Sequence, residues 1–404
     1  MSNTIKYTKI VTYDNFPFGG APANYLRNFA LSIALQEGNN VNVILPTGNY
    51  YGNSSDLNTS RAGSVENVTY QHLCYVEHPK NYLGKFLDNI CGCLLPIAYF
   101  IKERIRNKVD VIIIYNTTFT RTLTFLLIKF IIGKKLIIIL PEYYEKPANT
   151  YSLARLKWLN FYFGMSNLVQ YADKFIVLSD FLKNYLIAKN ICEENILILP
   201  NITDPEIFKV HNATEHIKDK ITIGYSGTPT RKDGIVDLIE SFAILTKKHA
   251  NIHLLIIGDV VGGKTVIPEL RKNTEQLGIS DQVTFTGLVP FKEVPQLLNS
   301  CQILALTRPS GVFAEAGFPT KLGEYFACMK PVLVTAVGDI KKYFVNCIHA
   351  VIAEPENIDS IVKGFDSLIV NEQLRQQLAV NAYQWLQENL NYRALSTKIN
   401  NFTA

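Results

Sequence analysis

The sequence lacks an excess of charge of either sign. Its 404 residues include 40 Lys and Arg against 35 Asp and Glu, and the formal net charge is only +5. No signature of RNA or DNA binding accompanies this modest charge, so we expect no nucleic-acid partner. Hydrophobic residues make up 48% of the chain, which excludes a disordered protein, and the length favours about two domains.

The chain also lacks a disulfide framework and a secretory leader. Seven cysteines, an odd number without regular spacing, indicate reduced thiols and a cytoplasmic protein. Cys91 and Cys93 form a lone C-x-C with too few ligands nearby for zinc, so we assign them to helix packing and expect no metal site. The segment 1–16 has no apolar core of the secretory type, so we expect no signal peptide.

Long hydrophobic runs are missing as well. The longest, 90–101 and 123–132, fall short of the ~20 residues that span a bilayer, so we expect no segment to cross a membrane. The stretches 97–108 and 124–135 are apolar and end in basic residues. Such helices can lie on the anionic inner face of a membrane, and burial against a sheet explains the same apolarity, so both interpretations remain open.

Short apolar runs, rich in Ile and Val, alternate with helical patterns along the chain. Continuous rather than alternating hydrophobicity is typical of parallel strands covered on both faces. The runs lie at 9–13, 41–45, 109–115, 135–140 and 174–178, and again at 221–225, 252–258, 282–287, 302–307, 331–335 and 350–353.

The alternation lapses around 200–220, where the sequence is polar and unpatterned, and then restarts. This predicts an α/β protein with two doubly wound, Rossmann-like domains, 1–203 and 204–380. The helical segment 381–404 is expected to pack back toward the first domain. Ligands of such folds bind at the carboxyl ends of strands, and the cleft between the two domains is the expected site.

A Gly-Gly turn follows the first expected strand, in "FPFGGAPAN" (16–24). Gly19 and Gly20 allow the backbone to approach a ligand closely, although a purely structural turn is the alternative. The dinucleotide fingerprint G-x-G-x-x-G is absent here, which argues against a nicotinamide or flavin cofactor.

Three further candidate positions follow strands of the second half. In "GYSGTPTRKDG" (224–234), Arg231 and Lys232 suit a diphosphate, with a solvated loop as the alternative. In "FTGLVP" (285–290), main-chain groups are placed to contact a nucleobase, or the segment is a simple turn. The third, "GFPTKLGEYFA" (317–327), begins a helix whose free N–H groups, with Lys321, suit an anion.

These motifs together resemble those of the family 4 glycosyltransferases, which have the GT-B fold. The resemblance rests on "FPFGGAPANYLR", "GTPTRKDG", "VTFTGLV" and "FPTKLGEYFACMKPVLVT" and covers nearly the whole chain. It implies that a sugar, of the hexosyl type, moves from a nucleotide-sugar to an acceptor with retention at the anomeric carbon. No metal or cofactor is implied, because the nucleotide-sugar is a co-substrate. The absence of any Asp-x-Asp motif agrees with that.

The resemblance also assigns roles by position. Arg231 and Lys232 correspond to the diphosphate-binding cations, the main chain at Leu288 to the base contact, and Glu324 to the ribose-binding glutamate. The N–H groups of Thr320 and Lys321 are expected to meet phosphate oxygens.

The sequence departs from the family pattern at two positions. Alanine occupies position 316, where the pattern has its first glutamate, and Glu315 lies one residue away. After the strand expected at 135–140, Pro141 and Glu142 stand where the family pattern has a histidine. We expect Glu142 to accept a hydrogen bond from the donor sugar or the acceptor, or else to cap the strand.

The expected function is synthesis of a surface polysaccharide or another glycan, with a glycan or lipid-linked glycan as acceptor. Two alternatives remain open from the sequence. A sugar-nucleotide epimerase needs clustered acid and base residues, and a non-catalytic nucleotide-sugar-binding protein needs no acceptor groove.

Overall fold

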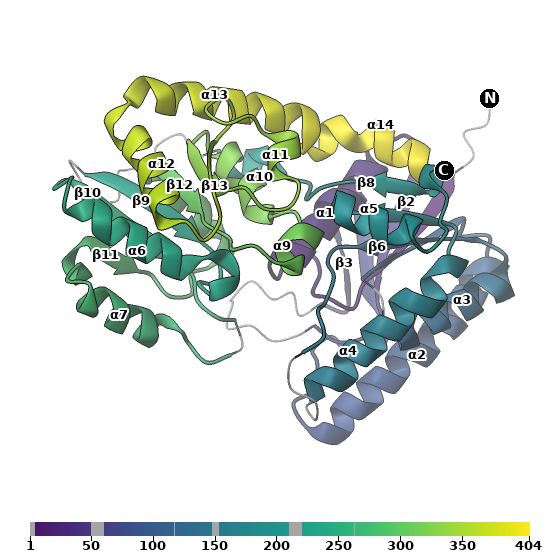
Figure 1. Cartoon of the computed structure of the whole chain (residues 1–404). Coiled ribbons are helices and arrows are strands. Elements are labelled where there is room, and N and C mark those ends of the chain that lie inside the picture. Colours follow the sequence, from purple (N-terminus) through teal and green to yellow (C-terminus); the bar gives the residue numbers. More distant parts are fainter. Residues whose placement is uncertain (1–4, 50–59, 117, 148–152, 210–219, 262) are drawn as a thin grey trace. The chain divides into compact units, whose positions relative to one another are not determined.

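The computed structural model describes residues 5–49, 60–116, 118–147, 153–209, 220–261 and 263–404 (Figure 1). These form two compact units. The first contains the described residues up to Ile202 together with Tyr392–Ala404, and the second is Thr203–Asn391.

The first unit is built on a sheet with the strand order β3-β4-β2-β1-β5-β6-β7-β8. All neighbours are parallel except β3 and β4, which form an antiparallel edge pair. The register places Ile10 beside both Val43 and Ile113, so the Ile- and Val-rich runs form the buried centre of the sheet. The strands are β1 Lys6–Val11, β2 Asn39–Leu45, β3 Ala62–Val65, β4 Val68–His72, β5 Val111–Tyr115, β6 Lys135–Leu140, β7 Lys174–Val177 and β8 Ile196–Ile198.

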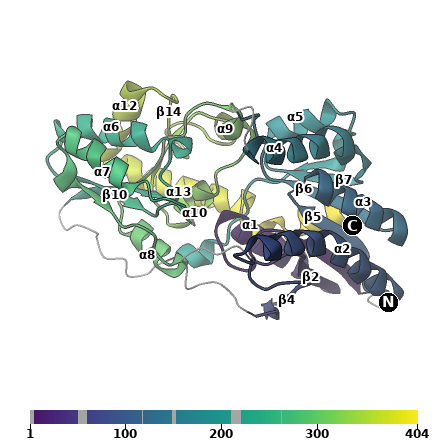
Figure 2. The same ribbon diagram turned by 90° about the horizontal axis from the view of Figure 1, so that it is seen from below.

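Helices cover both faces of this sheet. The chain moves from β1 to β2 in one direction and from β4 through β5 and β6 to β7 in the other, so right-handed crossovers place α1 opposite α2, α3 and α4. Figures 1 and 2 show α2, α3 and α4 together on one side of the sheet. The helices of the unit are α1 Ala21–Ala34, α2 Tyr82–Ile105, α3 Phe119–Ile132, α4 Leu153–Phe163, α5 Asp180–Ile187 and α14 Tyr392–Thr403.

The C-terminal helix α14 belongs to the first unit, as the sequence suggested. It packs on α1, where the Ser396 hydroxyl donates to the Ser32 carbonyl at 2.6 Å and Asn400 Nδ2 donates to the same oxygen at 3.2 Å. The division falls at Asn391 rather than at 380, because α13 (Glu372–Asn389) is one continuous helix with buried residues in the second unit.

The second unit has an all-parallel sheet with the order β11-β10-β9-β12-β13-β14. The strand order reverses between β9 and β12, so this is the point at which a doubly wound sheet opens a crevice for a ligand. The strands are β9 Ile221–Ser226, β10 Ile252–Ile257, β11 Val283–Phe285, β12 Ile303–Leu306, β13 Val332–Thr335 and β14 Val351–Ala353. The remaining helices are α6 Ile235–Thr246, α7 Ile267–Gln276, α8 Val294–Asn299, α9 Val312–Ala316, α10 Thr320–Ala327, α11 Ile340–Tyr343 and α12 Ile358–Val370.

The structure adds elements that hydrophobicity did not reveal. Strands β3 and β4 contain polar residues and so produce no continuous apolar run, and the edge strand β8 is apolar but only three residues long. Helix α4 is followed directly by a π-helical turn at Gly164–Leu168 and a 3-10 turn at Val169–Tyr171. A Cβ on Gly164 would lie 2.7 Å from the backbone nitrogen of Phe119, so the path of the chain there requires glycine.

A buried ion pair fixes α2 to the central strand β1. Lys9 Nζ lies 2.8 Å from Glu103 Oε2, and both side chains are buried. Removing one partner leaves an uncompensated charge in the interior, whereas replacing both with apolar groups does not.

We therefore expect Lys9→Met to lower the free energy of unfolding of the first unit by about 3 kcal/mol. The double variant Lys9→Met/Glu103→Leu should recover most of this loss. Urea unfolding followed by circular dichroism measures both. Equal destabilisation by the single and double changes would show that packing, not charge, matters at this position.

Candidate functional site

Two glycines between β9 and α6, Gly227 and Gly234, lie where the ends of β9 and β12 meet. Gly227 has φ +134°, and a Cβ there would lie 2.3 Å from Cε of Lys321. Gly234 has φ +71°, and a Cβ there would lie 1.6 Å from the carbonyl oxygen of Thr307. Both positions therefore require glycine, and the loop between them lies tightly against Lys321 and the end of β12.

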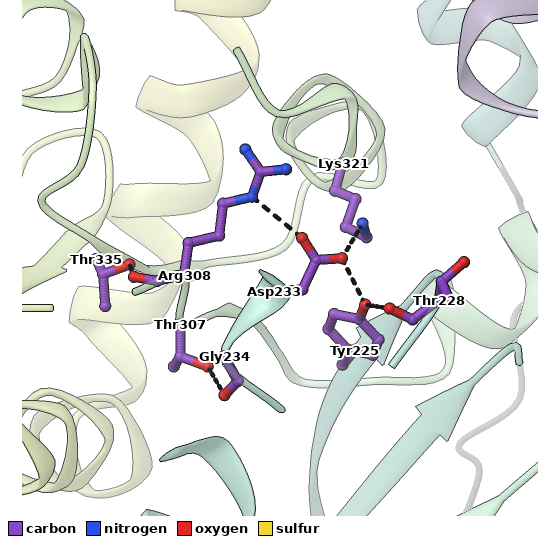
Figure 3. Close-up of polar contacts among 8 residues, drawn as sticks. All are labelled: Tyr225, Thr228, Asp233, Gly234, Thr307, Arg308, Lys321 and Thr335. Carbon is purple, nitrogen blue, oxygen red and sulfur yellow. Dashed lines mark hydrogen bonds and ion pairs between the residues drawn. The ribbon is translucent and has the colours of Figure 1, made fainter. Parts of the chain in front are cut away.

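A buried carboxylate, Asp233, gathers two cations at this point (Figure 3). Its Oδ2 lies 2.7 Å from Lys321 Nζ and its Oδ1 lies 3.1 Å from Arg308 Nε. The Tyr225 hydroxyl is 2.8 Å from Asp233 Oδ2 and equally far from the carbonyl oxygen of Thr228. Residues from β9, from the loop after β12 and from α10 thus meet at one carboxylate.

Charge balance determines the ionisation of Asp233. Burial alone would raise the pKa of its carboxyl, but Lys321 and Arg308 outweigh this effect and lower the pKa to about 2. Asp233 is therefore ionised at neutral pH, where the site holds one negative and two positive side chains. The net positive charge is available to an anion.

Backbone contacts hold the loops that carry these groups. The Thr307 hydroxyl donates to the carbonyl oxygen of Gly234 at 2.7 Å, and the Thr335 hydroxyl donates to that of Arg308 at 2.6 Å. Figure 3 shows both links to the left of Asp233. The end of β12 is therefore tied to the loop after β9, and the end of β13 is tied to the loop after β12.

The two cations predicted after β9, Arg231 and Lys232, are not among the side chains bonded to Asp233. Arg231 and Lys232 are both exposed. Lys232 Nζ lies 3.2 Å from the ring centroid of Phe313, and the charge of Arg231 acts on Asp237. Lys321, which was predicted, is inside the cluster. Asp233 and Arg308 were not predicted, although Arg308 follows a buried strand directly and Asp233 precedes a glycine.

Glu324 lies one turn into α10 and is half-buried. Burial raises the pKa of its carboxyl to about 7, and the charge of Lys321 opposes this rise. Among the residues that the structure describes, none forms a hydrogen bond with this carboxylate. Thr320 is the first residue of α10, after Pro319, and the helix has no side-chain cap. An unpaired carboxylate beside an uncapped helix start can accept hydrogen bonds from hydroxyls.

The other predicted donor-site residues also follow strands of this sheet or begin its helices. Leu288 is exposed just after β11, beyond Gly287, whose carbonyl oxygen accepts from the Gly258 backbone N–H at 3.1 Å. Glu315 is exposed on α9, and its Oε1 accepts from the Gly338 backbone N–H at 3.2 Å. Glu315 is thus engaged with a turn after β13.

The remaining predicted residues belong to the first unit. Gly19 and Gly20 have φ +132° and +94° and lead into α1. Glu142 follows β6 and accepts a hydrogen bond from the Tyr144 hydroxyl. Asp14, which the sequence reasoning missed, comes soon after β1.

Electrostatics connect Asp14 with Glu142. Burial raises the pKa of Asp14, Arg121 opposes this, and the negative charge of Glu142 adds to the rise. Asp14 follows a buried strand by a few residues, as Glu142 does. This position in the sequence could have identified Asp14 as a candidate site residue. The first unit therefore carries two acidic side chains at the carboxyl ends of its strands.

Comparison with known proteins agrees with the position of the charged cluster. Residues 206–385 match the family described as Glycosyl transferases group 1. This segment includes Asp233, Arg308, Lys321 and Glu324.

Individual proteins are similar over different lengths. An uncharacterized glycosyltransferase of Methanocaldococcus jannaschii is 22% identical over 55% of this chain and 56% of its own length. The capsular polysaccharide biosynthesis glycosyltransferase CapM of Staphylococcus aureus is 25% identical over 52% and 56%. The chain spans about half the length of these curated relatives.

The solved structure of Anabaena HepE in complex with UDP superposes with a TM-score of 0.68 at 17% identity, covering 98% of this chain and 97% of that one. At this identity the likeness shows the fold, which is the GT-B arrangement of two Rossmann-like domains. The predicted fold class is confirmed.

The raised pKa of Glu324 predicts a pH-dependent affinity for a nucleotide-sugar. A carboxylate accepts from two hydroxyls only when ionised, so affinity should rise about tenfold between pH 6 and pH 8, as Glu324 ionises near pH 7. The diphosphate of a nucleotide-sugar remains ionised over this range, so titration calorimetry with UDP-glucose isolates the protein group.

Glu324→Gln should bind more weakly and lose the pH dependence, whereas the control Glu315→Gln should keep it. A pH profile that is the same in Glu324→Gln and in the unmodified protein would exclude Glu324 as the titrating group.

Proposed function

We propose that the chain is a glycosyltransferase that moves a hexosyl group from a nucleotide-sugar to a glycan or lipid-linked glycan with retention at the anomeric carbon. The observation that carries the proposal is a pair of cations, Lys321 and Arg308, that are both bonded to Asp233. The unpaired carboxylate of Glu324 lies on the same helix as Lys321. Cations suit a diphosphate, and a carboxylate one turn away suits the two hydroxyls of a ribose.

The donor nucleotide is proposed to lie along the carboxyl ends of the second sheet. Lys321, Arg308 and the start of α10 bind the diphosphate, Glu324 binds the ribose, and the main chain at Leu288 contacts the base. The structures of HepE with UDP and with UDP-glucose support UDP-sugars as the first donors to test. The likeness to CapM supports an acceptor that belongs to a polysaccharide.

The chemical step that we propose needs charge stabilisation more than a protein nucleophile. The bond between the anomeric carbon and the diphosphate oxygen breaks, and its electron pair leaves with the diphosphate. Lys321 and Arg308 stabilise the charge that develops there, together with the helix dipole of α10. The acceptor oxygen bonds to the anomeric carbon from the same face, and its proton passes to an oxygen of the departing diphosphate.

The carboxylates of the first unit are proposed to bind sugar hydroxyls. Glu142 is the predicted residue, and Asp14 adds a second carboxylate that can accept hydrogen bonds. Gly19 and Gly20 form the turn before α1. Because the departing diphosphate accepts the proton, these carboxylates position hydroxyls rather than act as the general base.

The test is a donor screen that measures nucleoside diphosphate release with EDTA present, followed by mass spectrometry of the products. We expect Lys321→Met to reduce kcat by about 100-fold, the scale of one electrostatic donor, with a smaller change in KM for the donor. Arg231→Met, which removes an exposed charge of the same loop, should change kcat less than about threefold.

Other outcomes of the same screen would overturn the proposal. Formation of a 2-epimer of the donor would indicate an epimerase, and binding without turnover would indicate a nucleotide-sugar-binding protein. Loss of turnover in EDTA that manganese restores would contradict the proposed charge stabilisation by Lys321 and Arg308 alone.

A further inference from the structure

The outer faces of α2 and α3 are apolar, which reverses the usual pattern of a surface helix. On α2 the exposed positions follow one stripe at intervals of three and four residues: Leu83, Leu87, Ile90, Leu94, Ala98, Ile101 and Ile105. On α3 they are Phe119, Leu123, Leu127, Phe130 and Ile131. Leu94 is 60% exposed and Phe130 87%.

These stripes belong to one surface. Helix α2 packs beside α3, and α3 beside α4, on the same face of the first sheet (Figures 1 and 2). Helix α4 adds Leu156, Tyr162 and Phe163, all exposed. We call this surface, formed by the exposed residues of α2, α3 and α4, the apolar face.

Charge on these three helices is segregated by sign. They carry seven basic residues, Lys85, Lys102, Arg104, Arg121, Lys129, Arg155 and Lys157, against two acidic ones. The acids are Asp88 and Glu103, and both are buried: Asp88 is hydrogen-bonded to His78 at 2.7 Å, and Glu103 forms an ion pair with Lys9 at 2.8 Å. The Asp, Glu, Lys and Arg side chains that α2 exposes are therefore all basic.

The contacts of Asp88 and Glu103 also determine whether α2 remains packed on the first unit. By length and composition α2 is the one helix in the described part of the chain that would suffice to cross a membrane. Its opposite stripe, however, is held in the first unit by Asp88, Glu103 and the buried Phe100. Removing α2 from the unit would break the buried Lys9–Glu103 ion pair and the His78–Asp88 hydrogen bond, so α2 is fixed as a surface helix.

We propose that the apolar face docks on an anionic lipid bilayer, with its apolar side chains at the boundary of the acyl chains and its basic residues among the headgroups. Helices of this kind bind membranes through buried apolar area and through attraction of Lys and Arg to anionic lipids. A second copy of the chain is a poorer occupant, because two such faces would place like charges against each other.

This inference rests on the proposed function in one respect, that docking would bring the enzyme to a lipid-linked acceptor. Binding to vesicles requires neither donor nor transfer. A protein that binds vesicles without releasing nucleoside diphosphate, or the reverse, separates the two proposals.

The experiment is flotation of the full-length protein with vesicles of phosphatidylcholine, with and without phosphatidylglycerol. We expect binding that depends on the anionic lipid and weakens with added salt. Lys85→Gln/Lys102→Gln/Lys157→Gln should reduce binding roughly fivefold for each lysine removed. Leu83→Gln/Leu94→Gln/Phe130→Gln should reduce it at least tenfold with an unchanged melting temperature.

The matched control is Val345→Gln/Val370→Gln/Val380→Gln, which removes three exposed apolar residues of the second unit and should leave binding intact. Absence of vesicle binding, equal binding to neutral vesicles, or equal loss in the control would overturn the proposal. Light scattering that shows a dimer dissociated by the Leu83, Leu94 and Phe130 changes would assign the face to a contact between copies.

Discussion

The carboxylate of Asp233 is the constraint on which the proposed donor site depends. Two cations that lay side by side without it would repel each other, and the interior would not tolerate both. With Asp233 between them, Lys321 and Arg308 are held in place while the cluster keeps a net positive charge. The glycine at 227 is explained by the same constraint, because any Cβ there would collide with Lys321.

A similar arrangement of charge appears in the first unit, with a different consequence. There the acids of α2 lie inside, paired with Lys9 and His78, and the bases lie outside. Pairing the acids internally stabilises the attachment of α2 and leaves its outer surface positive and apolar. In both units, buried carboxylates determine where positive charge is presented.

Much of the fold could be predicted because the central strands are buried on both faces. Runs such as 109–115 and 135–140 contain little besides Ile, Leu and Val at their centres, and each corresponds to a strand. The edge strands β3 and β8 were not found in this way, since β3 is small and largely exposed and β8 is only three residues long. The boundary of the second domain was predicted at 380 rather than at Asn391, because the helical pattern of α13 continues through 380 without a change in composition.

The site was predicted in part, and the reason is geometric. Lys321 and Glu324 share one helix, so their spacing fixes their relation, and the sequence identified both. Asp233 and Arg308 are 75 residues apart and meet only because β9 and β12 are neighbours in the sheet. Adjacent basic residues drew attention to Arg231 and Lys232, whereas the structure exposes both and buries the acid that follows them.

The most direct test of this account is a crystal structure of the chain with a bound nucleoside diphosphate. The account predicts phosphate oxygens at charge-assisted hydrogen-bond distance, about 2.8 Å, from Lys321 Nζ, with the ribose hydroxyls on the Glu324 carboxylate. A diphosphate bound by Arg231 and Lys232, with Glu324 making no contact to the nucleotide, would contradict it.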